Sequence, residues 1–134
     1  MPSLADYKVL HSEALELKSD GTTIRDKVLE LEWVPPPRFV KGTTEARPVL
    51  TYQLWTIKPS KLTIAFKGVN APTVTNFHVR GPVAGGQLIV GNALFHGPHL
   101  AEKGDISITA DFFDNQQASH FWVELVTIMF QRFR

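Results

Sequence analysis

Cysteine is absent from the 134 residues of this chain. Its absence excludes disulfide bonds, thiolate metal sites and cysteine nucleophiles, while it leaves the cellular compartment open. The sequence also lacks an apolar run of the ~18 residues that a membrane-spanning helix requires. Residues 1–10 include Asp6 and have no long apolar core, so we expect no secretory signal and place the chain in the cytoplasm or in a larger particle.

An excess of charge is lacking as well, because the formal net charge is +1. A surface that follows the phosphates of nucleic acid usually shows a basic excess, so nucleic acid is not an expected partner. Hydrophobic residues make up 43% of the chain and charged residues 20%, proportions that exclude a disordered chain. The length is typical of one domain, and we expect residues 1–134 to form a single β domain without a cofactor.

Short stretches with alternating apolar and polar residues account for much of the sequence after residue 48. The alternation is clearest in residues 62–66 and 106–112 and predicts strands with one buried face. Further strands are expected at 49–57, 74–79 and 88–95. Glycines and prolines separate these segments, and the intervals leave no room for the helices of a parallel sheet. The sequence therefore predicts an all-β fold, an antiparallel β-sandwich, jelly roll or barrel of about eight or nine short strands.

The N-terminal residues 1–33 allow two interpretations. Apolar residues between 4 and 17 fit a helical stripe, whereas Asp20-Gly21 is a typical turn of a β-hairpin. We favour the hairpin. Three consecutive prolines exclude a strand or helix at the start of residues 34–48, so this segment is predicted to be a long exposed loop. Residues 49–134 then supply the main strands.

Residues 120–133 differ from the other segments because they are apolar at both parities. A central strand covered on both faces and a buried helix both fit this pattern, and the β-branched and aromatic residues favour the strand. The core of a sandwich needs only one face of a strand, so the other face requires a cover. The N-terminal segment and the loop before residue 48 are possible covers, but we expect another copy of the chain. The predicted interface residues of this homo-oligomer are Trp122, Val126, Ile128 and Phe130.

Two tryptophans stand on the more polar faces of their predicted strands. Trp55 shares its parity with Thr51 and Gln53, and Trp122 shares its parity with His120. A tryptophan on a partly polar face can stack on a sugar ring or anchor a protein interface. The alternative is that both indoles belong to the core. With a carbohydrate or a protein as the partner, the predicted ligand-binding residues are Trp55, Trp122, His78 and His120.

One turn contains the residues for an alternative, catalytic function. His96, His99 and Glu102 combine two imidazoles with a carboxylate, a set that can bind zinc, iron or copper or act in acid–base catalysis. Asp111 and Asp114 are further candidate metal ligands beside His96 and His99. The simpler interpretation is that all of these are ordinary turn residues. The sequence contains no Gly-x-Ser-x-Gly, P-loop or dinucleotide-binding motif.

These observations predict a non-enzymatic β-sandwich that works by recognition and self-assembly. It would bind a glycan or a protein, either as a lectin-like module or as a structural subunit. The alternative is a small metal-assisted or acid–base enzyme that uses the turn with His96, His99 and Glu102. Because β-sandwiches carry all of these functions, the predicted fold does not decide between them.

Overall fold

The structure, a computed structural model, describes residues 3–20, 25–40, 47–56, 60–70, 73–80, 87–95, 98–112 and 118–133. Within these ranges the chain forms nine β-strands and one short 3-10 helix, η2 (His99–Ala101). The strands are β1 (Ser3–His11), β2 (Leu15–Ser19), β3 (Val28–Trp33), β4 (Val49–Thr56), β5 (Ser60–Gly68), β6 (Thr73–Arg80), β7 (Gln87–Leu94), β8 (Gly104–Asp111) and β9 (Ser119–Phe133).

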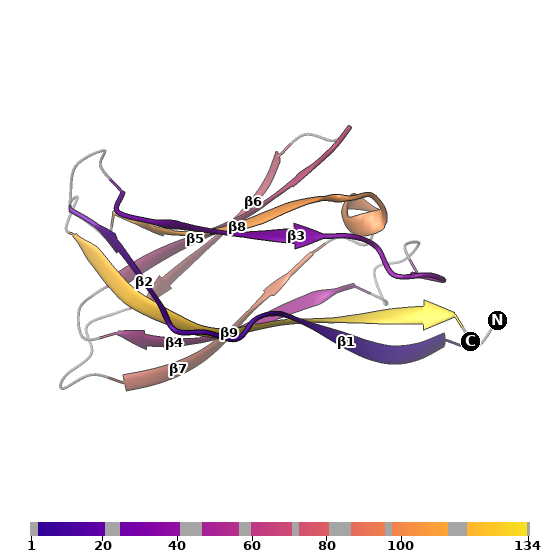
Figure 1. Ribbon diagram of the computed structural model, residues 1–134, viewed down its shortest axis with the longest axis horizontal. Helices are drawn as coiled ribbons and strands as arrows, with labels where there is room; N and C mark the ends of the chain where they lie inside the picture. Colours follow the sequence, from indigo (N-terminus) through magenta and orange to yellow (C-terminus); the bar gives the residue numbers. More distant parts are fainter. Residues whose placement is uncertain are drawn as a thin grey trace.

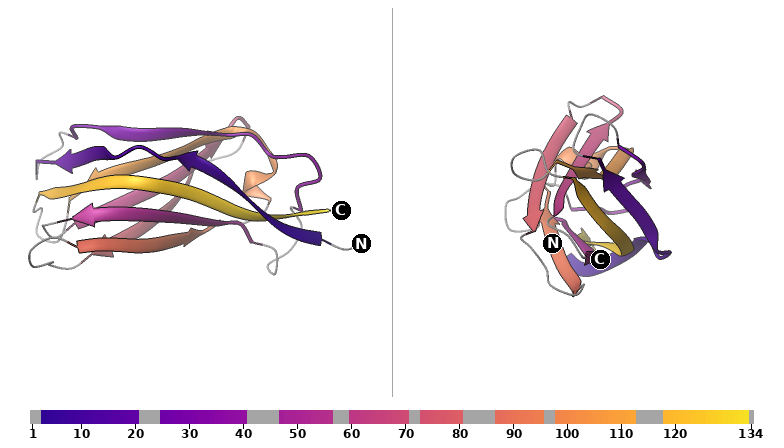
Figure 2. Two further views of the ribbon diagram at one scale, coloured as in Figure 1. Left: turned by 60° about the horizontal axis from the view of Figure 1, so that its bottom comes forward. Right: turned by 90° about the vertical axis from the view of Figure 1, so that its left-hand side faces the viewer.

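The strands form two antiparallel sheets that lie face to face, as the two ribbon layers of Figure 1 show. The five-stranded sheet has the order β1-β9-β4-β7, with β2 pairing with β9 as well. The four-stranded sheet has the order β3-β8-β5-β6. Figure 2 shows β1 and β2 following each other along β9. When these two are taken as one interrupted strand, the order is that of a jelly roll, which confirms the predicted all-β fold class.

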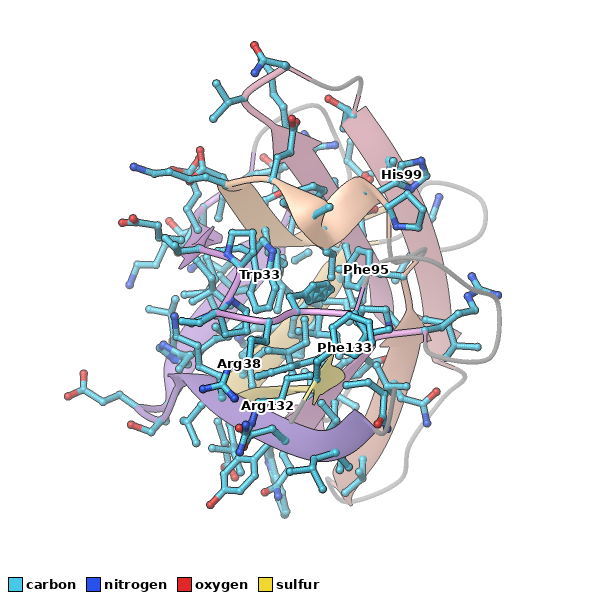
Figure 3. The ribbon with its side chains drawn as sticks, turned by 90° about the vertical axis from the view of Figure 1, so that its right-hand side faces the viewer. Trp33, Arg38, Phe95, His99, Arg132 and Phe133 are labelled. Atoms are coloured by element: carbon cyan, nitrogen blue, oxygen red, sulfur yellow. The ribbon has the colours of Figure 1, made fainter. Side chains whose placement is uncertain are left out.

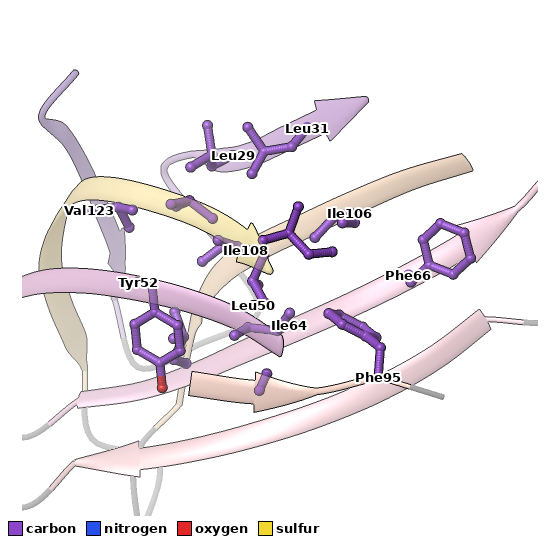
Figure 4. Close-up of a cluster of buried hydrophobic side chains, with 14 of the residues drawn as sticks. Leu29, Leu31, Leu50, Tyr52, Ile64, Phe66, Phe95, Ile106, Ile108 and Val123 are labelled. Carbon is purple, nitrogen blue, oxygen red and sulfur yellow. The ribbon is translucent and has the colours of Figure 1, made fainter. Parts of the chain in front are cut away.

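Alternating side chains of both sheets build one core between the layers. On β4, Leu50, Tyr52 and Leu54 are buried, while Thr51 and Gln53 between them are half-exposed. Figure 4 shows the inward side chains of the two sheets meeting in this cluster. Burial of every second residue is the reason that these segments form strands with one apolar face. The same alternation led to the strands predicted at 49–57, 62–66 and 106–112.

The first strands do not form the predicted hairpin. Gly21 of the predicted turn lies outside the described ranges, while the backbone N–H of Asp26 donates to the carbonyl of Lys18 at 2.9 Å. Beyond this hydrogen bond the chain crosses to the other layer, so that β2 pairs with β9 while β3 pairs with β8. The crossing buries Leu17 from one sheet and Leu29 from the other, and each sheet gains a strand over the shared core. Residues 3–11, where a helix was the alternative, form the strand β1.

The proline-rich segment packs over one end of the sandwich, which Figure 3 views directly. The ring of Phe39 lies 5.8 Å from that of Trp33 and 6.1 Å from that of Phe130, measured between ring centroids. The backbone N–H of Val40 donates to the carbonyl of Gln131 at 2.9 Å. Residues 34–40 are therefore only in part the exposed loop that the prolines predicted, because an aromatic residue after them docks on the core. Residues 41–46 lie outside the described ranges.

Two local features hold this segment in place. The indole N–H of Trp33, which is fully buried, donates to the carbonyl of Leu100 at 2.8 Å. Arg38 adopts a φ of 62°, a left-handed conformation that costs a non-glycine residue ~1–2 kcal/mol. In this conformation its carbonyl accepts the backbone N–H of Phe133 at 2.7 Å. The turn thereby connects the prolines to the end of β9.

A β-bulge in β9 changes the parity of its buried face. Leu54 of β4 pairs with Val123, and the preceding Gln53 pairs with Leu125, so that Glu124 has no partner in β4. An extra residue of this kind shifts the inward and outward alternation by one position. The residues that are buried therefore have odd numbers before the bulge and even numbers after it.

The bulge explains why residues 120–133 are apolar at both parities. The segment is a strand, as predicted, and its buried residues are Phe121, Val123, Val126, Ile128 and Phe130. The prediction that Val126, Ile128 and Phe130 form an interface between copies is wrong, because each is 5% exposed or less within the chain's own core. Trp122, the other predicted interface residue, is half-buried on the outer face of the five-stranded sheet.

Candidate functional site

Two tryptophans lie side by side on the outer face of the five-stranded sheet. Trp55 of β4 pairs with Trp122 of β9, and Glu16 of β2 pairs with Trp122 from the other side. Leu54 and Thr56 on either side of Trp55 are buried, so the Trp55 indole points away from the core. Trp55 is 38% exposed. Because cross-strand partners have Cβ atoms ~4.5–5.5 Å apart, the two indoles start from neighbouring positions and make this part of the face aromatic.

An imidazole and a carboxylate border this aromatic surface. The ring centroids of His120 and Trp122 are 4.5 Å apart, with the rings tilted by 41°. Nε2 of His120 lies 2.9 Å from Oε1 of Glu16. The contact is a hydrogen bond when the imidazole is neutral and an ion pair when it is protonated. We call Glu16, Trp55, His120 and Trp122 the aromatic site; it combines flat apolar faces with hydrogen-bonding groups.

Hydrogen bonds at the start of β9 position the aromatic site. The buried hydroxyl of Thr56 donates to the carbonyl of His120 at 3.0 Å, which joins the end of β4 to the start of β9. The hydroxyl of Ser119 accepts the backbone N–H of Lys61 at 3.0 Å, which joins β9 to β5 of the opposite sheet. These bonds hold the strand ends in register and thereby keep the two tryptophans opposite each other.

Most of the predicted ligand-binding residues meet at this site, but His78 does not. The two tryptophans and His120 share the outer face of the five-stranded sheet. The backbone of His78 pairs with that of Leu62 in the four-stranded sheet. Glu16 was outside the predicted set. Its position between two apolar residues indicated an outward side chain, but its place beside His120 depends on a strand pairing that no local pattern reveals.

The predicted catalytic turn takes part in structural contacts. Oε1 of Glu102 accepts the backbone N–H of Asn70 at 3.0 Å. The same carboxylate lies over Gly68, where an added Cβ would collide with it, so this close approach requires glycine. His99 is the first residue of η2, and His96 lies outside the described ranges. Glu102 therefore ties the segment after η2 to the turn after β5.

Asp111, a predicted metal ligand, is engaged with its own neighbours. Its Oδ2 accepts the hydroxyl of Thr63 at 3.0 Å and pairs with the guanidinium of Arg25 at 3.3 Å. Partial burial raises the pKa of Asp111, but hydrogen bonds from the Phe112 backbone N–H and the Thr63 hydroxyl, together with the charge of Arg25, lower it more. The pKa therefore lies below the ordinary value of 3.8, and the carboxylate is ionised at neutral pH.

The other predicted metal ligands do not join Asp111. His99 precedes the start of β8 and Asp111 ends it, and β8 itself is ~23 Å long at ~3.3 Å per residue. Asp114 and His96 lie outside the described ranges. Across the residues that the structure describes, no group of three His, Asp or Glu side chains is placed to hold a metal ion. The two described members of the predicted metal set, His99 and Asp111, therefore stand before and at the end of β8.

No protein family and no curated protein sequence matches this chain. A structure of the infectious bursal disease virus Gt strain is similar, with 10% identity, a TM-score of 0.46 and coverage of 97% of this chain and 33% of that chain. The VP2 subviral particle of infectious bursal disease virus has 10% identity and a TM-score of 0.47 over 97% of this chain and 32% of that chain. This chain thus spans about one third of the length of the virus chains.

A third similar structure is the family 11 carbohydrate-binding module from Clostridium thermocellum, in complex with a β-1,3-1,4-mixed-linked tetrasaccharide. Its identity is 12% and its TM-score 0.44, over 96% of this chain and 84% of that chain. At such identities the likeness concerns the fold alone. The described residues contain no helix that is long and apolar enough to cross a membrane. Fold and site define a jelly-roll β-sandwich with an aromatic cluster on the outer face of one sheet.

Proposed function

We propose that this chain is a non-enzymatic recognition module that binds a neutral glycan at the aromatic site. The observation that carries the proposal is the pairing of Trp55 with Trp122 on an outward face, with His120 and Glu16 at their border. A pyranose ring presents C–H groups on its face and hydroxyls on its rim. Flat indoles suit the face of the ring, and the imidazole and carboxylate suit the hydroxyls.

The charge of Glu16 supports a neutral rather than an acidic sugar. Its side chain is 40% exposed, so the carboxylate is accessible to a ligand on the two tryptophans. An ionised carboxylate accepts hydrogen bonds from hydroxyls strongly, whereas it repels the carboxylate of an acidic sugar. The outer face of a sheet is open along its strands, which suits several linked sugars better than a small enclosed metabolite.

Isothermal titration of the full chain tests the proposal. The probes are neutral oligosaccharides of glucose, mannose and galactose, with sialyllactose as the acidic comparison. We expect one neutral series to bind and sialyllactose not to bind. Trp55→Ala should weaken that binding at least ~10-fold, which is ~1.4 kcal/mol. Val28→Ala is the matched control, because Val28 is 43% exposed on the other sheet, and it should bind like the unmodified chain.

Tryptophan fluorescence provides an independent measurement. Trp33 is fully buried, so a bound sugar changes the emission of Trp55 and Trp122 while Trp33 stays constant. The proposal would be overturned if Trp55→Ala and Trp122→Ala both bound the sugar as tightly as the unmodified chain. It would also be overturned if no neutral probe bound at millimolar concentration. Release of shortened oligosaccharides during the titration would instead support the enzymatic alternative.

A further inference from the structure

The outer face of the five-stranded sheet has a second exposed region at the opposite end from the aromatic site. Tyr7 pairs with Met129, Met129 with Val49, and Val49 with Leu94. Tyr7 is 64% exposed, Met129 49% and Leu94 48%. One row of large apolar side chains therefore crosses β1, β9, β4 and β7 in contact with solvent.

The rows beside it continue without a charged side chain. The next row consists of Val9, Thr127, Thr51 and Asn92, and the row after it consists of Leu125, Gln53 and Val90. Val9 is 49% exposed and Val90 62%. We call these three rows the uncharged block. Charged residues make up 20% of the chain, and none stands in these rows; the half-buried Glu124, unpaired at the bulge, lies next to Leu125 at their border with the aromatic site.

The outer face of the four-stranded sheet shows the contrast. There Glu32 pairs with Asp105, and Asp105 with Lys67, and all three side chains are exposed. Glu30 is exposed on the same sheet. This face has the alternation of apolar inside and charged outside that is typical of a solvated sheet. The uncharged block lacks that pattern, and large exposed apolar patches on soluble proteins usually mark a binding surface.

We propose that the uncharged block is the contact between two copies of this chain, packed sheet against sheet about a twofold axis. In such a contact the same patch stands on both sides, and a charged residue near the axis meets its own copy. A patch without charges avoids this repulsion, whereas a partner chosen by charge would require charges to pair with.

The side-chain sizes in the block also suit a second copy. The rows with Met129 and with Val90 carry large apolar side chains, and the row between them places Thr51 and Thr127 on its central strands. Met129 is longer than Thr51 and Thr127, so Met129 of one copy can pack over these two threonines of the other. Stacked sheets lie ~10 Å apart with interleaved side chains, which is the spacing that this packing needs.

The inferred contact does not rest on the proposed glycan binding. Val49, the partner of Met129, lies ~20 Å from Trp55 along β4 at ~3.3 Å per residue, whereas the row with Gln53 and Leu125 is next to the aromatic site; a variant at Met129 therefore leaves the aromatic site unaltered. A variant of one surface therefore tests that surface alone. Trp55→Ala should lose the sugar and keep the dimer, while a variant of the block should lose the dimer and keep the sugar.

Sedimentation equilibrium of the full chain over a range of micromolar concentrations tests the contact. We expect a mass of twice 15.0 kDa for the unmodified chain. Met129→Lys should reduce the mass to 15.0 kDa, since each copy then brings a charge to the contact. Val28→Lys is the matched control, because Val28 is 43% exposed on the other sheet, and it should keep the dimer mass.

Circular dichroism of each variant shows whether it is folded. If Met129→Lys is unfolded, Leu94→Lys on the outermost strand β7 provides the same test. An unmodified chain that stays at 15.0 kDa throughout would overturn the proposal. So would a folded Met129→Lys or Leu94→Lys that keeps the dimer mass, or a Val28→Lys that loses it, because any of these results assigns the contact elsewhere.

Discussion

Deletion of Glu124 tests the role of the β-bulge in orienting β9. Without this residue, Val123 and Leu125 become consecutive, as their partners Leu54 and Gln53 are, so β9 alternates regularly and keeps its buried face. Insertion of an alanine between Leu125 and Val126 instead turns over the side chains that follow, and Val126, Ile128 and Phe130, now at most 5% exposed, would then face solvent. Burial of such a side chain stabilises a protein by ~1.5–3 kcal/mol, so the loss is ~5–9 kcal/mol in total. Small domains have unfolding free energies of ~5–15 kcal/mol, so we expect the insertion variant not to reach the native state, whereas the deletion variant should fold.

Urea unfolding, followed by circular dichroism and by the fluorescence of the buried Trp33, measures this effect. Glu124→Ala is the matched control, because it keeps the number of residues in β9 and therefore the bulge. Its unfolding free energy should stay within ~0.5 kcal/mol of the unmodified chain. A deletion variant that does not fold, or an insertion variant that unfolds at the same urea concentration as Glu124→Ala, would refute the assignment of the parity change to this one residue.

Three further predictions concern stability. The folded pKa of Asp111 lies below 3.8, so its charge stabilises the fold above that pH. This contribution is lost as the pH falls through the folded pKa. In Asp111→Asn, the urea midpoint should therefore depend less on pH below about pH 5 than in the unmodified chain. Trp33→Phe leaves the buried carbonyl of Leu100 without its donor and should lower the unfolding free energy by ~1–3 kcal/mol; an unchanged midpoint would exclude this hydrogen bond as a contributor. Arg38→Gly removes the cost of the left-handed conformation and should raise the unfolding free energy by up to ~1 kcal/mol, which would be seen as a higher midpoint of thermal unfolding. A lower midpoint would contradict the strain at Arg38.

The alternation of apolar and polar residues was sufficient to predict most of the strands and the fold class. It works for β5 and β8 because each has one face in the core and one face outside. The prolines correctly excluded regular structure in residues 34–40. They did not reveal that Phe39 docks on Trp33, because a docking partner is a property of the whole fold rather than of the loop.

Alternation failed where the backbone departs from regular pairing. The bulge at Glu124 joins two apolar sets of opposite parity into one buried face, so β9 alone was misread as a strand with two covered faces. The hairpin prediction failed for a related reason. Whether β3 continues in the same sheet as β2 depends on the core that lies between β2 and β8.

The aromatic site divides in the same way between local pattern and tertiary structure. The outward direction of Trp55 follows from its own strand, since its sequence neighbours are buried. That Trp55 stands opposite Trp122, and Glu16 opposite His120 across 104 residues of chain, follows only from the order β2-β9-β4 within the five-stranded sheet. A local pattern determines which way a side chain points because it depends on neighbours in the same strand. Which side chains meet is decided by strand pairing, which minimises the free energy of the whole sandwich.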